Sequence, residues 1–148
     1  MLKTFRESLC AGILITIGGT VFLSCENKTV GAVLFSVALL CICYKGYYLF
    51  TGKIGYIVEQ HKKQDFLNLA VGLFGNLIAT FLLGMLLRTV LPNIGERAAE
   101  MCSAKLAQFP LYSFIRGFFC GILMYLAVSI YKEKNSVLGV LFCVPVFI

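Results

Sequence analysis

The chain has 148 residues, of which 59% are hydrophobic and 14% are charged, and this composition excludes an ordinary soluble domain. Its net charge is +6, but the basic residues are spread between apolar runs and are not gathered on one face, which argues against a nucleic-acid-binding protein. The sequence therefore predicts one all-α domain, residues 1–148, built as a polytopic bundle of transmembrane helices.

Uncharged runs along the chain predict four membrane spans and part of a fifth. The first run is too long and too rich in glycine for a simple signal peptide. The last run is too short to cross a bilayer core, so we expect the chain to stop within its fifth helix and the cut end of that helix to fray. The spans are expected at 8–25, 29–58, 66–91, 106–131 and, incomplete, at 135–148.

Basic residues in the short loops favour one orientation in the membrane. The segments on the N-terminal side carry lysine and arginine with few acids, whereas the segments on the other side mix the two signs. By the positive-inside rule, we expect the N-terminus to lie in the cytoplasm. The basic residues on the expected cytoplasmic side are Lys3, Arg6, Lys62, Lys63, Lys132 and Lys134.

The second span carries the most information, because it is too long for one crossing. As a straight helix, 29–58 would reach about 45 Å, whereas a bilayer core is roughly 30 Å thick. Gly46, Gly52 and Gly55 are permissive points for a break. A single tilted helix is one explanation. We favour the other, a helix broken near 49–53 at the membrane midplane, since half-helix ends at that depth commonly build an anion or ion site.

Residue patterns typical of enzymes and metal sites are not found in the sequence. It has no Ser/His/Asp set, no paired carboxylates within a span and no phosphate loop, so we expect no enzyme. The seven cysteines lack C-x-x-C spacing with a histidine partner, so we expect packing residues, no metal site and no cofactor. The single histidine, His61, lies beside lysines and is expected to be a solvated loop residue.

The segment YLFTG at 48–52 resembles the E-L-F-T-G/S signature of the formate/nitrite transporter family, which forms a loop that breaks the second helix. Three more runs are similar to family motifs in the same order. Each motif alone is weak, being small residues on an apolar helix, but the four together cover nearly the whole chain. The three runs are AGILITIGG at 11–19, GNLIATFLLG at 75–84 and SFIRGFFCGILMYLAVSIY at 113–131.

This resemblance implies a channel or transporter for small monovalent anions such as formate, nitrite and hydrosulfide, in the bacterial inner (plasma) membrane. It also implies an aquaporin-like fold of two inverted repeats, with broken second and fifth helices and with five protomers in a ring. The chain stops before the segment that carries the family's central pore histidine. The alternative is therefore a truncated, non-transporting membrane remnant.

Three consecutive residues match the family's constriction at the helix break. Leu49 and Phe50 resemble its apolar gate, where they would form a dry and narrow passage, and the alternative is that both are ordinary core residues. Thr51 would offer its hydroxyl and the following half-helix N-terminus to an anion. It could equally serve as the N-cap of that helix alone.

Three further residues match pore positions elsewhere in the chain. Lys105 corresponds to the vestibule lysine and would concentrate anions, although an ordinary loop charge is the alternative. Phe147 aligns with the apolar gate residue of the broken fifth helix. Gly121 replaces the family's asparagine, and with Gly117 it gives a spacing typical of close helix packing, which we favour.

Overall fold

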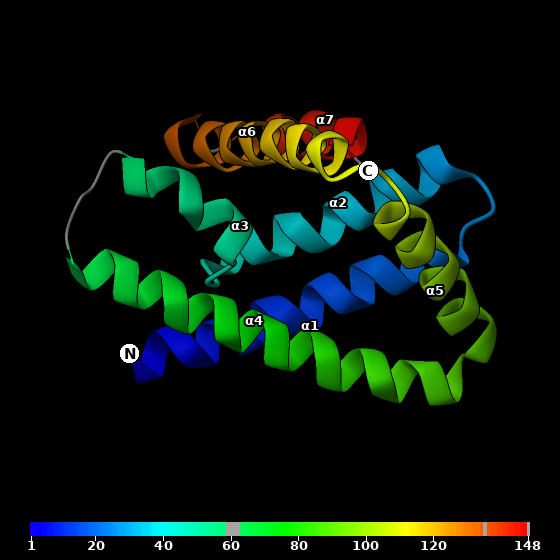
Figure 1. Ribbon diagram of the computed structural model, residues 1–148. Coiled ribbons are helices and arrows are strands. Elements are labelled where there is room, and N and C mark those ends of the chain that lie inside the picture. The colour runs from blue at the N-terminus through cyan, green and yellow to red at the C-terminus, as the bar shows by residue number, and fades with distance from the viewer. Residues whose placement is uncertain (59–62, 135, 148) are drawn as a thin grey trace.

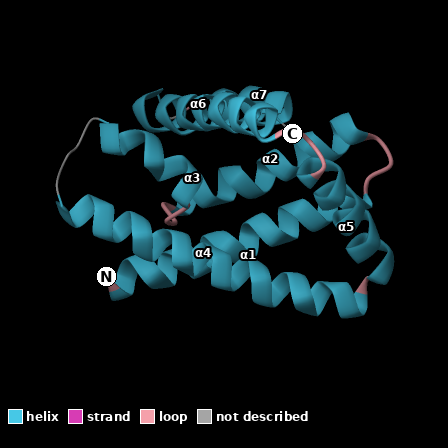
Figure 2. Cartoon of the chain, in the orientation of Figure 1, coloured by secondary structure: helices cyan, strands magenta, loops and turns pink. Residues whose placement is uncertain are grey.

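The computed structural model describes residues 1–58, 63–134 and 136–147, apart from the side chains of 57, 58 and 147. In these residues the secondary structure is helical (Figure 1), and short loops join the helices (Figure 2). The elements are α1 Leu2–Ser24, α2 Lys28–Lys45, α3 Phe50–Lys53, the 3-10 helix η1 Ile54–Val58, α4 Lys63–Val90, α5 Pro92–Leu106, α6 Pro110–Lys134 and α7 Leu138–Phe147.

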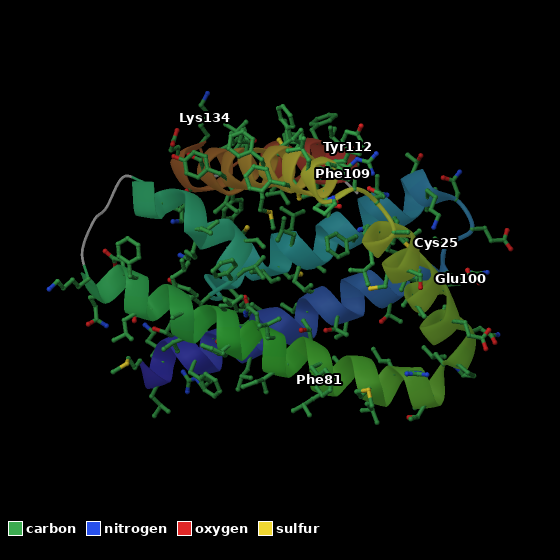
Figure 3. All side chains as sticks on the ribbon, in the orientation of Figure 1. Cys25, Phe81, Glu100, Phe109, Tyr112 and Lys134 are labelled. Carbon is green, nitrogen blue, oxygen red and sulfur yellow. The ribbon has the colours of Figure 1, made fainter. Side chains whose placement is uncertain are left out.

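Four helices, α1, α2, α4 and α6, are long and apolar enough to cross a membrane. With 28 residues, α4 reaches about 42 Å, more than a bilayer core requires. Its outer side carries exposed apolar side chains such as Phe74 and Phe81, and Phe81 points away from the bundle in Figure 3. Such a surface is typical of helices that face lipid.

The ends of the long helices gather in two groups (Figure 1). The N-terminus, the start of α4 and the last turns of α6 lie at one end of the bundle, and the α1–α2 loop and α5 lie at the other. Lys134 is accordingly far from Cys25 and Glu100 in Figure 3. The chain thus brings together the basic segments that the sequence assigns to one side, and the orientation of that side in the membrane stays a prediction.

Small residues bring α1 and α4 close together. A Cβ at Gly12 would lie 2.7 Å from the Cβ of Ala79, and a Cβ at Gly75 would overlap the side chain of Ser8. Small residues at such an interface allow two backbones to approach, which favours van der Waals contact between membrane helices. The buried core beside this interface consists of Ala11, Leu39, Ile42, Leu49, Met124, Ala127, Val140 and Val144.

The C-terminal run forms a packed helix over its described residues. α7 lies against α6 and α2, and the side chains of Val140 and Val144 are fully buried. A Cβ at Gly139 would lie 2.7 Å from Cγ2 of Ile130, so α6 and α7 approach closely. Over its described residues the segment therefore does not fray as expected, because two neighbouring helices cover its apolar face, and the expected cut end at Ile148 lies outside the description.

The connection between α4 and α6 is a helix, although the sequence analysis treated it as a loop. Pro92 occupies the first turn of α5, where its fixed φ favours a helix start and its missing N–H is not needed. No described residue of α5 is buried. Arg97 holds the helix to α1, because its Nη1 donates a hydrogen bond to the carbonyl oxygen of Leu23 at 3.0 Å.

Candidate functional site

The second span is broken between α2 and α3, at Gly46–Leu49. Gly46 adopts the left-handed conformation, with φ 67° and ψ 23°. Its N–H donates to the carbonyl of Cys43 at 3.1 Å, and the N–H of Tyr47 donates to that of Ile42 at 3.0 Å, which is the Schellman pattern that ends a helix.

The break therefore lies earlier than expected, and residues 50–53 of the expected break are helical. The reason is that Gly46, and not Gly52, supplies the left-handed residue that stops the helix. Gly52 remains inside α3, where it allows close packing: a Cβ there would lie 3.2 Å from Cγ2 of Val128 on α6.

One side chain on α4, Asn76, holds the broken backbone in place. Its Oδ1 accepts a hydrogen bond from the N–H of Phe50 at 2.8 Å, which satisfies the first residue of α3. Its Nδ2 donates to the carbonyl oxygens of Ser8 at 2.7 Å and Tyr48 at 3.1 Å. Asn76 is only 8% exposed. It thus satisfies backbone groups of the break and of α3 that hydrocarbon would leave unpaired, and its further bond to the Ser8 carbonyl joins them to α1.

Sequence reasoning missed Asn76, although one signal was available. It is an amide in the middle of a long uncharged run, and polar groups at such depth usually bond to another helix. The neighbouring glycines also shape this contact. A Cβ at Gly72 would overlap the ring of Tyr48, so this glycine leaves room for the break to lie against α4.

A cavity of about 550 Å³ lies beside the break, between α1, α3, α4 and α6. Four of the six residues chosen from the sequence line it: Leu49, Phe50, Thr51 and Gly121. Phe35 of α2 also lines it and was not anticipated. The walls are mainly apolar, and the polar side chains among the lining residues are those of Thr51, Asn76, Thr80 and Cys120.

Leu49 separates this cavity from a second, smaller one. The smaller cavity measures about 50 Å³ and lies toward the C-terminal end of α6, where Val128 and Lys132 contribute to its wall. Leu49 lines both cavities and is itself only 8% exposed. Its side chain thus lies where a path from one cavity to the other would pass.

Thr51 is not the N-cap that the sequence analysis considered. Leu49 occupies the N-cap position of α3 without a side-chain hydrogen bond, and Thr51 lies one residue inside the helix with an exposed side chain. The half-helix also offers less to an anion than expected. α3 has only four residues, and the N–H of Phe50 is already bonded to Asn76.

The glycines of α6 do not pack against another helix of this chain. A Cβ at Gly117 or Gly121 would meet no described atom within 4 Å. The close-packing interpretation is therefore wrong among the described residues. Both glycines instead line cavities, so the missing side chains leave open space there.

The remaining chosen residues lie away from the cavity or outside the described side chains. Lys105 is exposed in the last turn of α5 and does not line the cavity. Phe147 ends α7, and its side chain lies outside the description, as does all of His61. Among the described residues, no group of His, Cys, Asp or Glu side chains is arranged to hold a metal.

The N-terminal half of α6, next to α5 and called here its outer half, leaves one side of the site uncovered. Every residue from Phe109 to Phe119 is exposed. The rings of Phe109 and Tyr112 contact each other edge to face, with centroids 6.0 Å apart, at the start of this stretch (Figure 3). The cavity therefore has two kinds of wall. On one side it is bounded by the well-packed helices α1 and α4, and on the other by α6, whose outer half is exposed.

Comparisons with known proteins agree with this architecture. A family model described as "Formate/nitrite transporter" matches residues 1–148. A solved structure described as "Pentameric formate channel with formate bound" is similar over 99% of this chain and 67% of its own, with 26% sequence identity and a TM-score of 0.79. A search of curated proteins gave no match.

Proposed function

This chain belongs to the formate/nitrite transporter family, and from this premise we propose that it is a membrane channel or transporter subunit for small monovalent anions such as formate and nitrite. The observation that carries the proposal is the cavity at the break, where Leu49, Phe50 and Thr51 face Gly121. Asn76 supports it by holding the backbone of the break.

In the proposed pathway, an anion enters the large cavity from the end at which α5 lies. In this cavity the Thr51 hydroxyl donates a hydrogen bond to the anion and replaces a water molecule of its hydration shell. Leu49 is the gate, because a narrow apolar passage admits a small, weakly hydrated anion more easily than a strongly hydrated ion. Lys105 concentrates anions near the entrance without contacting them in the gate.

The proposal extends to assembly and location. The similar solved structure is pentameric, and we propose a homopentamer in which each protomer has its own pore. The basic segments at the α6 C-terminal end support a cytoplasmic N-terminus, and the bacterial plasma membrane is proposed from the family resemblance alone. The 148 residues would form a single transmembrane domain in lipid, with Phe147 near the second half of the gate.

The decisive experiment is anion flux into vesicles that contain the purified chain. A conducting subunit gives saturable formate and nitrite uptake above that of empty vesicles. Leu49→Ala should raise uptake and weaken discrimination against larger anions, whereas Leu82→Ala on the exposed side of α4 should change neither. Uptake of larger anions unchanged by Leu49→Ala would contradict the gate assignment.

The second candidate is the non-transporting membrane remnant. It is supported by the exposed outer half of α6, which leaves one wall of the large cavity uncovered. The same flux measurement separates the two candidates. Flux no higher than that of empty vesicles, from protein shown to be folded, would favour the remnant.

A further inference from the structure

Two lysines from different helices line the small cavity beyond Leu49. Lys53 reaches it from the last turn of α3, and Lys132 from the last turn of α6. Both side chains line the same cavity of about 50 Å³, and this small volume places them near each other. The other residues around this cavity are Leu39, Ile42, Cys43, Gly46, Tyr47, Leu49, Gly52, Val128 and Tyr131.

Aromatic rings hold both ammonium groups without neutralising them. Nζ of Lys53 lies 5.5 Å from the ring centroid of Tyr48, and Nζ of Lys132 lies 4.0 Å from that of Tyr56. A ring face attracts a cation but carries no net charge. The rings therefore favour these positions of the two lysines without supplying a negative charge that would compete with an anionic ligand.

Among the described residues, neither lysine forms an ion pair with a carboxylate. The carboxylate of Glu7 on α1 forms its ion pair with Lys3, at 3.9 Å. Glu133 accepts a hydrogen bond from Ser129 Oγ at 2.6 Å. Two like charges that face each other repel, and an anion between them would relieve the repulsion.

We propose that Lys53 and Lys132 form a binding site for a small monovalent anion, separated by Leu49 from the large cavity. The ligand class rests on the proposed function, but the binding itself does not require transport. The cavity of about 50 Å³ holds the equivalent of about three waters, which suits an anion of three heavy atoms such as formate or nitrite. In a conducting subunit, this site receives the anion that has passed the gate.

Formate binding to the full chain in detergent tests the proposal, read by saturation transfer to the formate proton. Lys53→Gln and Lys132→Gln should each raise the half-saturating formate concentration about threefold or more. Lys132→Arg should keep it within about twofold of the original, because the charge remains. Lys134→Gln is the matched control, since it removes the same charge two residues further along α6, and it should leave binding unchanged.

If Lys132→Gln and Lys134→Gln weakened formate binding equally, the proposal would be overturned, because binding would then depend on the overall charge of the protein and not on this site. Unchanged binding in Lys132→Gln would also overturn it, and this exposed position decides the question even if Lys53→Gln fails to fold. The proposed function fails separately. If the chain binds formate through these lysines but shows no flux, the binding site stands and the proposed channel function is contradicted.

Discussion

On one side of the large cavity, α1, α4 and the break are joined by three hydrogen bonds from Asn76, and small residues bring the helices together. On the other side, the outer half of α6 is exposed from Phe109 to Phe119, and Gly121 faces open space. The same cavity therefore has one wall whose geometry is fixed within the chain and one whose packing is loose. We expect substitutions on the first wall to affect folding and substitutions on the second to affect it little.

The largest expected effect comes from removing the amide that joins the first wall. Asn76→Ala leaves the Phe50 N–H and the Tyr48 carbonyl without their partner and removes a second bond from the Ser8 carbonyl, and it should lower the free energy of unfolding by about 2–4 kcal/mol. The measurement is unfolding in mixed micelles. Asn68→Ala on the same helix, whose bond to Gln64 is exposed, should change it by less than about 0.5 kcal/mol. If the two variants lowered the free energy of unfolding equally, Asn76 would have no special role in fixing the first wall.

A pair of glycine substitutions compares the two walls directly. Gly75→Ala forces a methyl group into the side chain of Ser8 and should destabilise the protein by about 1–3 kcal/mol. Gly121→Ala adds the same methyl group in open space and should be neutral, or stabilising by up to about 1 kcal/mol through helix propensity. Thermal unfolding of both variants in one detergent would measure the difference. A destabilised Gly121→Ala would indicate that something covers α6 in the assembled protein.

The smallest expected effect is at Lys105, outside both walls. Lys105→Ala should reduce formate uptake about twofold at low substrate and low salt, because the charge only raises the local anion concentration. The reduction should disappear as ionic strength rises. Lys28→Ala, at the same end of the bundle but on α2, is the control and should not reduce uptake. A salt-independent loss in Lys105→Ala would instead indicate direct contact with the anion.

Much of the architecture could be predicted because it follows from local patterns. The long apolar runs mark the membrane helices, and the excess length of 29–58 indicates a break. The resemblance at 48–52 directed attention to Leu49, Phe50 and Thr51, which line one cavity. That Leu49 and Phe50 form a gate, and that Thr51 offers its hydroxyl to an anion, stays a prediction.

Other features depend on contacts that no local pattern reveals. Asn76 was missed because its three partners lie on segments far from it in sequence. Gly117 and Gly121 were misread because their spacing permits a close helix neighbour but does not say whether one is present. The break was placed too late because several glycines compete for the left-handed position, and only the cap hydrogen bonds of Gly46 decide between them.

The position of Asn76 on α4 also has a consequence for how the protein enters the membrane. During synthesis, α1, α2 and the break emerge before α4, so Tyr48 and Phe50 are made before the side chain that bonds their backbone. Until α4 inserts, those groups must remain in water or in the translocation machinery, since lipid offers them no partner. The second helix therefore cannot settle as a finished broken span on its own. Its insertion is completed by the next helix in the chain, and a ribosome stalled before residue 76 should leave the break accessible to water-soluble reagents.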